Sequence, residues 1–128
     1  MIDPLFLTLD EVLALHEDQI QRYGGFVGIR DVALLKSAVG AVVATFDGRF
    51  LHETLFEMAA AILYGICRNH PFTNGNKRTA VAAALTFLEM NGIDINADED
   101  EFYGLVIGVA ESRVSKSAVA VFLHDHAH

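Results

Sequence analysis

The stretch that decides the fold is the nine-residue segment at positions 70–78, which reads His70-Pro71-Phe72-Thr73-Asn74-Gly75-Asn76-Lys77-Arg78. Residues 55–68 before it are rich in Ala, Ile, Leu and Met, and residues 79–90 after it are mostly Ala, Val, Leu and Phe. Apolar content of this kind predicts two buried helices, and the Pro and Gly between them predict a tight loop. The segment is therefore interpreted as a helix–loop–helix joint that carries polar side chains.

The second helix of this joint is predicted to begin with positive charge. A helix N-terminus carries a partial positive charge and normally collects Asp or Glu, but here Lys77 and Arg78 fall in the first turn. Gly75 lets the backbone bring its unpaired N–H groups together, and a phosphate is the anion that most often binds such a terminus. His70, which titrates near neutral pH, would lie beside it, so the cluster favours phosphoryl-type transfer. The alternative is that the cations only reach solvent and His70 is a satisfied polar residue.

The pattern His70-Pro71-Phe72-x-x-Gly75-Asn76-x-Arg78 resembles the signature of the Fic/Doc family. Fic enzymes usually read His-Pro-Phe-x-(Asp/Glu)-Gly-Asn-Gly-Arg-x-x-Arg and transfer AMP from ATP to a protein hydroxyl. This chain has Lys77 in place of a glycine, Val81 in place of the second arginine and Asn74 in place of a metal-binding carboxylate. The first two departures are similar to the Doc branch, whose toxins transfer the γ-phosphate of ATP to a threonine of elongation factor Tu. The segment Tyr23-Gly24-Gly25-x-x-Gly28-x-Arg30-Asp31 also resembles Doc-like chains.

This resemblance implies a Doc-like toxin kinase that phosphorylates a Ser or Thr hydroxyl of a protein, with elongation factor Tu as the family target. It implies His70 as the general base, with Lys77 and Arg78 as further catalytic residues. Mg²⁺ is expected with ATP, and Asn74 offers it a neutral oxygen, which is a weaker ligand than a carboxylate. The residues expected to bind ATP are Thr73, Gly75, Asn76, Lys77 and Arg78.

Two other functions remain open for the same residues. One is AMP transfer to a protein hydroxyl, and the other is a non-catalytic member that binds a nucleotide or a protein, which Asn74 favours. Self-inhibited Fic proteins carry a (Ser/Thr)-x-x-x-Glu-(Gly/Asn) segment, and the sequence contains none. Inhibition by a separate antitoxin of the Phd type is therefore expected.

Composition is typical of one domain covering residues 1–128. The net charge of −8 disfavours nonspecific binding to nucleic acid, so no nucleic-acid partner is expected. The longest apolar run, residues 58–67, is shorter than the roughly 20 residues that span a bilayer, and residues 1–4 do not resemble the start of a signal peptide, so no membrane role is expected. The single cysteine, Cys67, is expected in the core, which fits a cytoplasmic location.

The remaining pattern predicts an all-α, compact single-domain bundle of about six helices, with the active-site loop between the two central ones. The expected helices cover residues 9–23, a stretch after Asp31, residues 53–69, 76–91 and 98–110, and a last stretch from Ser115, with a turn at residues 47–49. A capping box of Thr8 and Glu11 is expected to begin the first helix. Asp31 is expected to cap the second helix, whose expected buried face carries Val32, Leu35, Val39 and Val42. The glycine-rich residues 24–30 have three interpretations: a turn, which fits best, a phosphate-binding loop, or a mobile flap. His16 is expected as a hydrogen-bonded residue on an apolar helix face rather than a catalytic one. The histidines at 124, 126 and 128 are expected on a frayed end, where metal binding is nonspecific.

Overall fold

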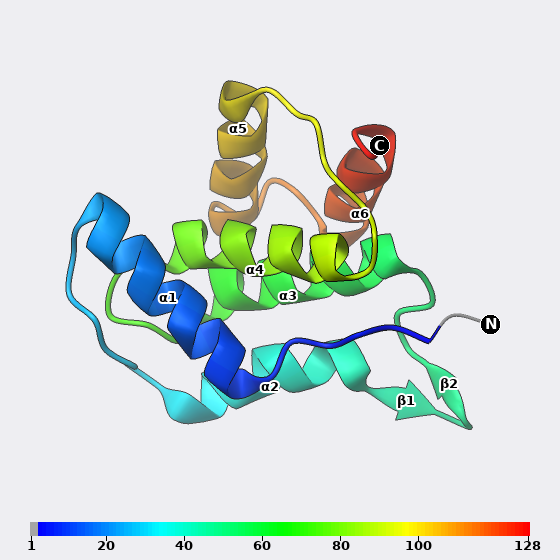
Figure 1. The fold of residues 1–128 in the computed structure, drawn as a ribbon, viewed down its shortest axis with the longest axis horizontal. Coiled ribbons are helices and arrows are strands. Elements are labelled where there is room, and N and C mark those ends of the chain that lie inside the picture. The colour runs from blue at the N-terminus through cyan, green and yellow to red at the C-terminus, as the bar shows by residue number, and fades with distance from the viewer. Residues whose placement is uncertain (1–2) are drawn as a thin grey trace.

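The structure, a computed structural model, describes residues 3–128. Within these residues the chain forms six helices and one very short hairpin (Figure 1). The elements are α1 (Leu9–Tyr23), α2 (Val32–Val43), β1 (Thr45–Phe46), β2 (Arg49–Phe50), α3 (Leu55–Asn69), α4 (Asn76–Met90), α5 (Glu99–Ala110) and α6 (Lys116–Asp125). The prediction of an all-α fold of about six helices is confirmed. The stretch at residues 1–4, where no signal peptide was expected, lies partly outside the described residues.

Helix α3 is the centre of the fold. It packs against α2, α4, α5 and α6, while α4 also contacts α1 and α5. Figure 1 shows α3 and α4 side by side in the middle of the molecule, with α2 on one side and α5 and α6 on the other. A Cβ at Gly65 would lie 3.0 Å from Cβ of Ala38, so the close approach of α2 and α3 requires a glycine there. Cys67 is fully buried on α3 as expected, and burial raises the pKa of its thiol to about 11.

The helix starts follow capping residues in the sequence. The Thr8 hydroxyl accepts the Glu11 N–H, and the Glu11 carboxylate accepts the Thr8 N–H, so α1 begins with the predicted capping box. Side-chain caps also open four further helices. These are Asp31 for α2, Thr54 for α3, Asp98 for α5 and Ser115 for α6. Local hydrogen bonding thus sets where these helices begin, and the remaining helix, α4, begins differently.

Three expectations about local structure are wrong. Helix α3 begins at Leu55 rather than near Glu53, because the Thr54 hydroxyl accepts the Glu57 N–H and so fixes the first turn. Val32 was expected on the buried face of α2, but it is 49% exposed at the first helical position, next to the exposed loop of residues 24–30. Leu35 and Val42 are buried as expected, together with Ala38, while Val39 is only partly buried.

The third difference is at the C-terminus, which is not frayed. The His126 carbonyl accepts the Asn96 N–H at 2.8 Å, and the His128 N–H donates to the Asp94 carbonyl at the same distance. These bonds flank an isolated bridge between Ile95 and Ala127. The sequence does not predict this pairing, because a bridge of one residue in each segment is too short to show the alternating apolar pattern of a strand.

The turn predicted at residues 47–49 is confirmed, although the two-residue strands beside it were not predicted. Asp47 and Gly48 both have positive φ, which is the conformation that joins β1 to β2 in a tight hairpin. No helix within residues 3–128 is both long enough and apolar enough to cross a membrane.

Candidate active site

His70 ends helix α3. Its N–H donates to the Ile66 carbonyl at 3.2 Å, and its backbone is left-handed, with φ 48° and ψ 55°. A left-handed conformation costs a residue with a side chain about 1–2 kcal/mol, so the surrounding contacts must hold it. Pro71 follows and prevents the helix from continuing. The side chain of His70 is exposed and therefore accessible to an incoming molecule.

Asn76 shapes the loop that joins α3 to α4. Its amide oxygen accepts the Phe72 N–H and its amide nitrogen donates to the Phe72 carbonyl, both at 3.0 Å. Phe72 itself is 1% exposed, so the loop is anchored by a buried ring and a paired backbone. Both polar atoms of the Asn76 side chain are used in this way, which leaves its backbone N–H as the group that can face a ligand.

The start of α4 is open. Gly75 precedes the helix with φ 72° and ψ 22°, and no side chain among residues 3–128 caps the helix. Its first turn contains no acidic residue, and neither Lys77 nor Arg78 forms an ion pair within the described part of the chain. The Arg78 guanidinium lies 5.3 Å from the centre of the Tyr23 ring, which keeps it beside the loop. Unpaired N–H groups and two cations at one helix start are the features that bind a phosphate.

The glycine-rich loop after α1 lies along the signature segment rather than forming an isolated turn. The Thr73 N–H donates to the Gly28 carbonyl at 3.1 Å, next to an antiparallel bridge between Ile29 and Phe72. The Asn74 amide oxygen accepts the Phe26 N–H at 2.8 Å. The loop therefore contacts the signature segment at Phe72, Thr73 and Asn74, and Asn74, predicted as a metal ligand, holds the loop with the oxygen that a metal would also use.

His16 supports the site from beneath. It is 2% exposed, its ring stacks on that of Phe72 with 3.8 Å between centres, and its Nδ1 lies 3.1 Å from the Thr79 hydroxyl. Burial lowers the pKa of His16, so the ring is kept neutral. Its Nε2 finds no hydrogen-bond partner in residues 3–128. The expectation of a hydrogen-bonded residue on an apolar helix face is confirmed.

One residue of this region was not expected to contribute. The side chain of Arg30 donates to the carbonyl oxygens of Asn69 and His70, at the end of α3. Its only signal in the sequence was its place in the second Doc-like segment, and no local pattern connects positions 30 and 70.

The fold and the site together define an all-α protein with a basic, uncapped helix start that follows an exposed histidine in the chain. The profile of the Fic/DOC family matches residues 6–88, which is more than half of the chain, and the chain therefore belongs to this family.

Two curated relatives make the comparison more specific. The chain is 38% identical to "Protein kinase doc" of Escherichia phage P1 over 114 residues, which is 89% of each chain. It is 46% identical to "Toxin Doc" of Mycolicibacterium smegmatis over 78 residues, which is 61% of this chain and 60% of that protein. The resemblance inferred from residues 70–78 is thus confirmed.

Proposed function

We propose that this protein is a toxin kinase that transfers the γ-phosphate of ATP to a Ser or Thr hydroxyl of a protein. The observation that carries the proposal is the uncapped start of α4, with Lys77 and Arg78 in its first turn, following the exposed His70 at the end of α3. The relative named Protein kinase doc supports the kinase activity, and the relative named Toxin Doc supports a toxin.

In this mechanism the start of α4 holds the triphosphate. The N–H groups that follow Gly75, together with Lys77 and Arg78, bind the phosphate oxygens and stabilise the charge on the transferring group. Thr73, exposed in the loop, supplies a hydroxyl at the edge of this site. The half-buried stem of Lys77 fills space beside the helix start, and its ammonium favours the most charged end of the triphosphate. The γ-phosphate is therefore placed nearest His70.

His70 then acts as the general base. It takes the proton of the acceptor hydroxyl, the hydroxyl oxygen bonds to the γ-phosphorus, and the bond from phosphorus to the oxygen of ADP breaks. Proton removal by a positioned base contributes about 10²–10⁴-fold to such a step. ADP leaves, and the proton remains on His70 until solvent removes it.

Mg²⁺ fits this site only alongside the nucleotide. The described residues contain no group of three or more His, Cys, Asp or Glu side chains placed to hold a metal, and the Asn74 oxygen already accepts the Phe26 N–H. Its second lone pair leaves room for one weak metal contact. The ion, which neutralises phosphate charge when bound, would be held mainly by the phosphates and water, with Asn74 as the protein ligand.

Elongation factor Tu is the proposed target, and a separate antitoxin of the Phd type is the proposed inhibitor. The target is taken from the resemblance of residues 70–78 to the Doc branch, while the relative named Toxin Doc and the missing self-inhibitory segment in the sequence support a separate antitoxin. An antitoxin would dock a flexible segment that folds on binding. Expression without such a partner should stop growth, and expression of the His70→Ala variant should not.

The decisive experiment is incubation of the protein with cell lysate and ATP labelled on either the γ- or the α-phosphate. Label from the γ-phosphate on one protein, lost in His70→Ala, is the expected result. His124→Ala is the matched control, because His124 contacts Phe56 near the opposite end of α3 and is also exposed. Label from the α-phosphate would establish AMP transfer instead, and no label with intact ATP binding would establish the non-catalytic alternative.

A further inference from the structure

Arg30 binds the backbone on both sides of the candidate base. Its Nε donates to the His70 carbonyl at 2.6 Å and its Nη2 donates to the Asn69 carbonyl at 2.8 Å. Its own N–H donates to the Pro71 carbonyl at 2.7 Å. One residue thus contacts three consecutive carbonyl groups at the end of α3.

These carbonyl groups need partners. The last carbonyl groups of a helix accept no hydrogen bond from within the helix. A cation at this end also interacts favourably with the negative end of the helix dipole. A guanidinium suits the position because its donors point in fixed directions and can bind two oxygens at once. The loop of residues 24–30 delivers this side chain from a place 40 residues earlier in the chain.

The geometry has a specific consequence for His70. The Asn69 carbonyl belongs to the peptide unit before the His70 Cα, and the His70 carbonyl belongs to the peptide unit after it. Fixing both units fixes φ and ψ of His70, and therefore the direction of its Cα–Cβ bond. Because His70 is in the left-handed region, it needs such external support to stay there.

We propose that Arg30 is the positioning residue for His70, which it holds in its left-handed conformation so that the imidazole faces the phosphate site. The proposal rests on the proposed function for the role of His70. Arg30 does not bind the nucleotide in this proposal, because its Nε and Nη2 are both directed at carbonyl oxygens. The loop keeps its course without the Arg30 side chain, since it is also held by backbone bonds from Thr73 to Gly28 and from Asp31 to Pro71.

The test uses Arg30→Gln and Arg30→Lys, with transfer and ATP binding measured separately. Displacing a catalytic group by about 1 Å can cost roughly 100-fold, so kcat for Arg30→Gln should fall by about 10–100-fold. The dissociation constant of ATP should change less than about twofold. Arg30→Lys retains one donor group and should restore part of the lost kcat, whereas a residue that only stabilised the loop would show no such graded recovery.

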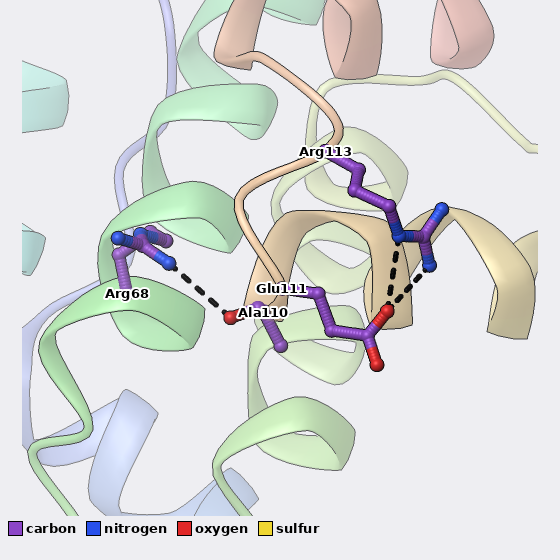
Figure 2. A network of polar contacts seen from close by, with 4 residues as sticks. All are labelled: Arg68, Ala110, Glu111 and Arg113. Atoms are coloured by element: carbon purple, nitrogen blue, oxygen red, sulfur yellow. Dashed lines mark hydrogen bonds and ion pairs between the residues drawn. The ribbon is translucent and has the colours of Figure 1, made fainter.

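Arg68 offers a matched control. It lies on the same helix, two residues before His70, and its Nη1 donates to the Ala110 carbonyl at the end of α5 at 3.2 Å (Figure 2). Arg68→Gln therefore also removes an arginine-to-carbonyl bond at a helix end, but it should leave kcat unchanged. A kcat loss of equal size in Arg68→Gln, or an unchanged kcat in folded Arg30→Gln, would overturn the proposal. A loss of ATP affinity in step with kcat would make Arg30 a phosphate ligand.

A structural measurement separates this proposal from the proposed function. The φ angle of His70, measured by NMR coupling constants or crystallography, should leave the left-handed region in Arg30→Gln and stay there in Arg68→Gln. If the wild-type protein transfers no phosphate, the proposed function fails, but this measurement still decides whether Arg30 sets the conformation of His70. If φ is unchanged in Arg30→Gln, the proposal is wrong even when the kinase activity is confirmed.

Discussion

Helices α1 and α4 are both 15 residues long, yet they begin in opposite ways. Thr8 and Glu11 satisfy each other's N–H groups at the start of α1, where Asp10 and Glu11 add favourable negative charge. The start of α4 has Gly75 in place of a capping side chain, and its first turn carries cations. At the start of α1 the protein's own side chains pair the free N–H groups. At the start of α4 the N–H groups and positive charges remain available to a ligand, as the proposed function requires.

Helices α1 and α4 are in contact, so their starts differ although both helices belong to the same region of the molecule. His16 of α1 reaches Thr79 of α4 and stacks on Phe72 in the loop before it. A Cβ added at Gly75 would lie 3.0 Å from Cδ1 of Ile20, again on α1. Helix α1, whose own start is capped, therefore packs directly against the uncapped start of α4. Substitutions at either helix start test how the difference between them affects binding and stability.

The largest effect is expected from closing the open start with Gly75→Asp. Aspartate tolerates positive φ better than most residues, and its carboxylate would cap the helix and oppose bound phosphate. ATP affinity should fall by about 100-fold or more, as measured by titration calorimetry with a non-hydrolysable ATP analogue. Gly75→Asn is the control because it meets the same Ile20 contact and offers a neutral cap. Equal affinities in the two variants would show that the terminus does not bind an anion.

The next effect concerns the residue that shapes the open start. Asn76→Ala removes two hydrogen bonds and leaves the buried Phe72 N–H and carbonyl unpaired, so it should lower the free energy of unfolding by about 2 kcal/mol. Asn91 makes the same two-bond contact with the backbone of Leu5, and its amide nitrogen also donates to the Phe87 carbonyl. Because Leu5 is exposed and water can reach its backbone in the variant, Asn91→Ala should still cost less. Urea denaturation measures both. A larger loss in Asn91→Ala would mean that burial of the Phe72 peptide is not what gives Asn76 its effect.

The contrast between the two starts also marks what the sequence could predict. The bounds of α1, its cap, the cap at Asp31 and the uncapped start of α4 were all predicted, because each depends on residues within one helical turn. The side-chain contacts that bring α1 and the loop of residues 24–30 against the candidate site were not predicted. His16 bonds to a residue 63 positions away, Asn74 to one 48 away and Arg30 to one 40 away. Periodicity and capping patterns contain no information on such pairs, since only the packing of helices brings them together.

A smaller effect is expected at the satisfied start. Thr8→Ala removes the hydroxyl that accepts the Glu11 N–H and should lower the free energy of unfolding by about 1 kcal/mol. Transfer activity and ATP affinity should be unchanged, because the capping box lies at the N-terminal end of α1. The loop of residues 24–30, which contacts the candidate site, follows Tyr23 at the opposite end. Thermal unfolding and the labelled-ATP assay provide the measurements. Loss of ATP binding in Thr8→Ala would show that the two starts are coupled rather than independent.

The smallest effect is expected at the contact between the two helices, and it depends on pH. Burial lowers the pKa of His16 below its ordinary value of 6.5, so the unfolded chain binds a proton more readily than the folded one. Stability from the neutral ring is therefore fully present above pH 6.5 and is lost progressively as the pH falls from that value through the lowered pKa of the folded state. His16→Phe retains a ring against Phe72 but cannot titrate, so its stability should fall less steeply between about pH 7 and 5.

Urea denaturation at several pH values measures how steeply the free energy of unfolding changes with pH. A second histidine, His52, is expected to contribute to the same slope. The pKa of His52 is lowered by burial and by Lys116, so it contributes in the same direction. The slope should therefore shrink in His16→Phe without disappearing, and His52→Gln should remove a separate part of it. If the His16→Phe slope equals that of the wild type, His16 binds a proton equally well in the folded and unfolded chains, so its ring becomes charged below about pH 6.5 and adds positive charge beneath the start of α4. ATP affinity would in that case rise as the pH falls in the wild type and not in His16→Phe, which makes the buried histidine, and not only Lys77 and Arg78, part of the difference between the two helix starts.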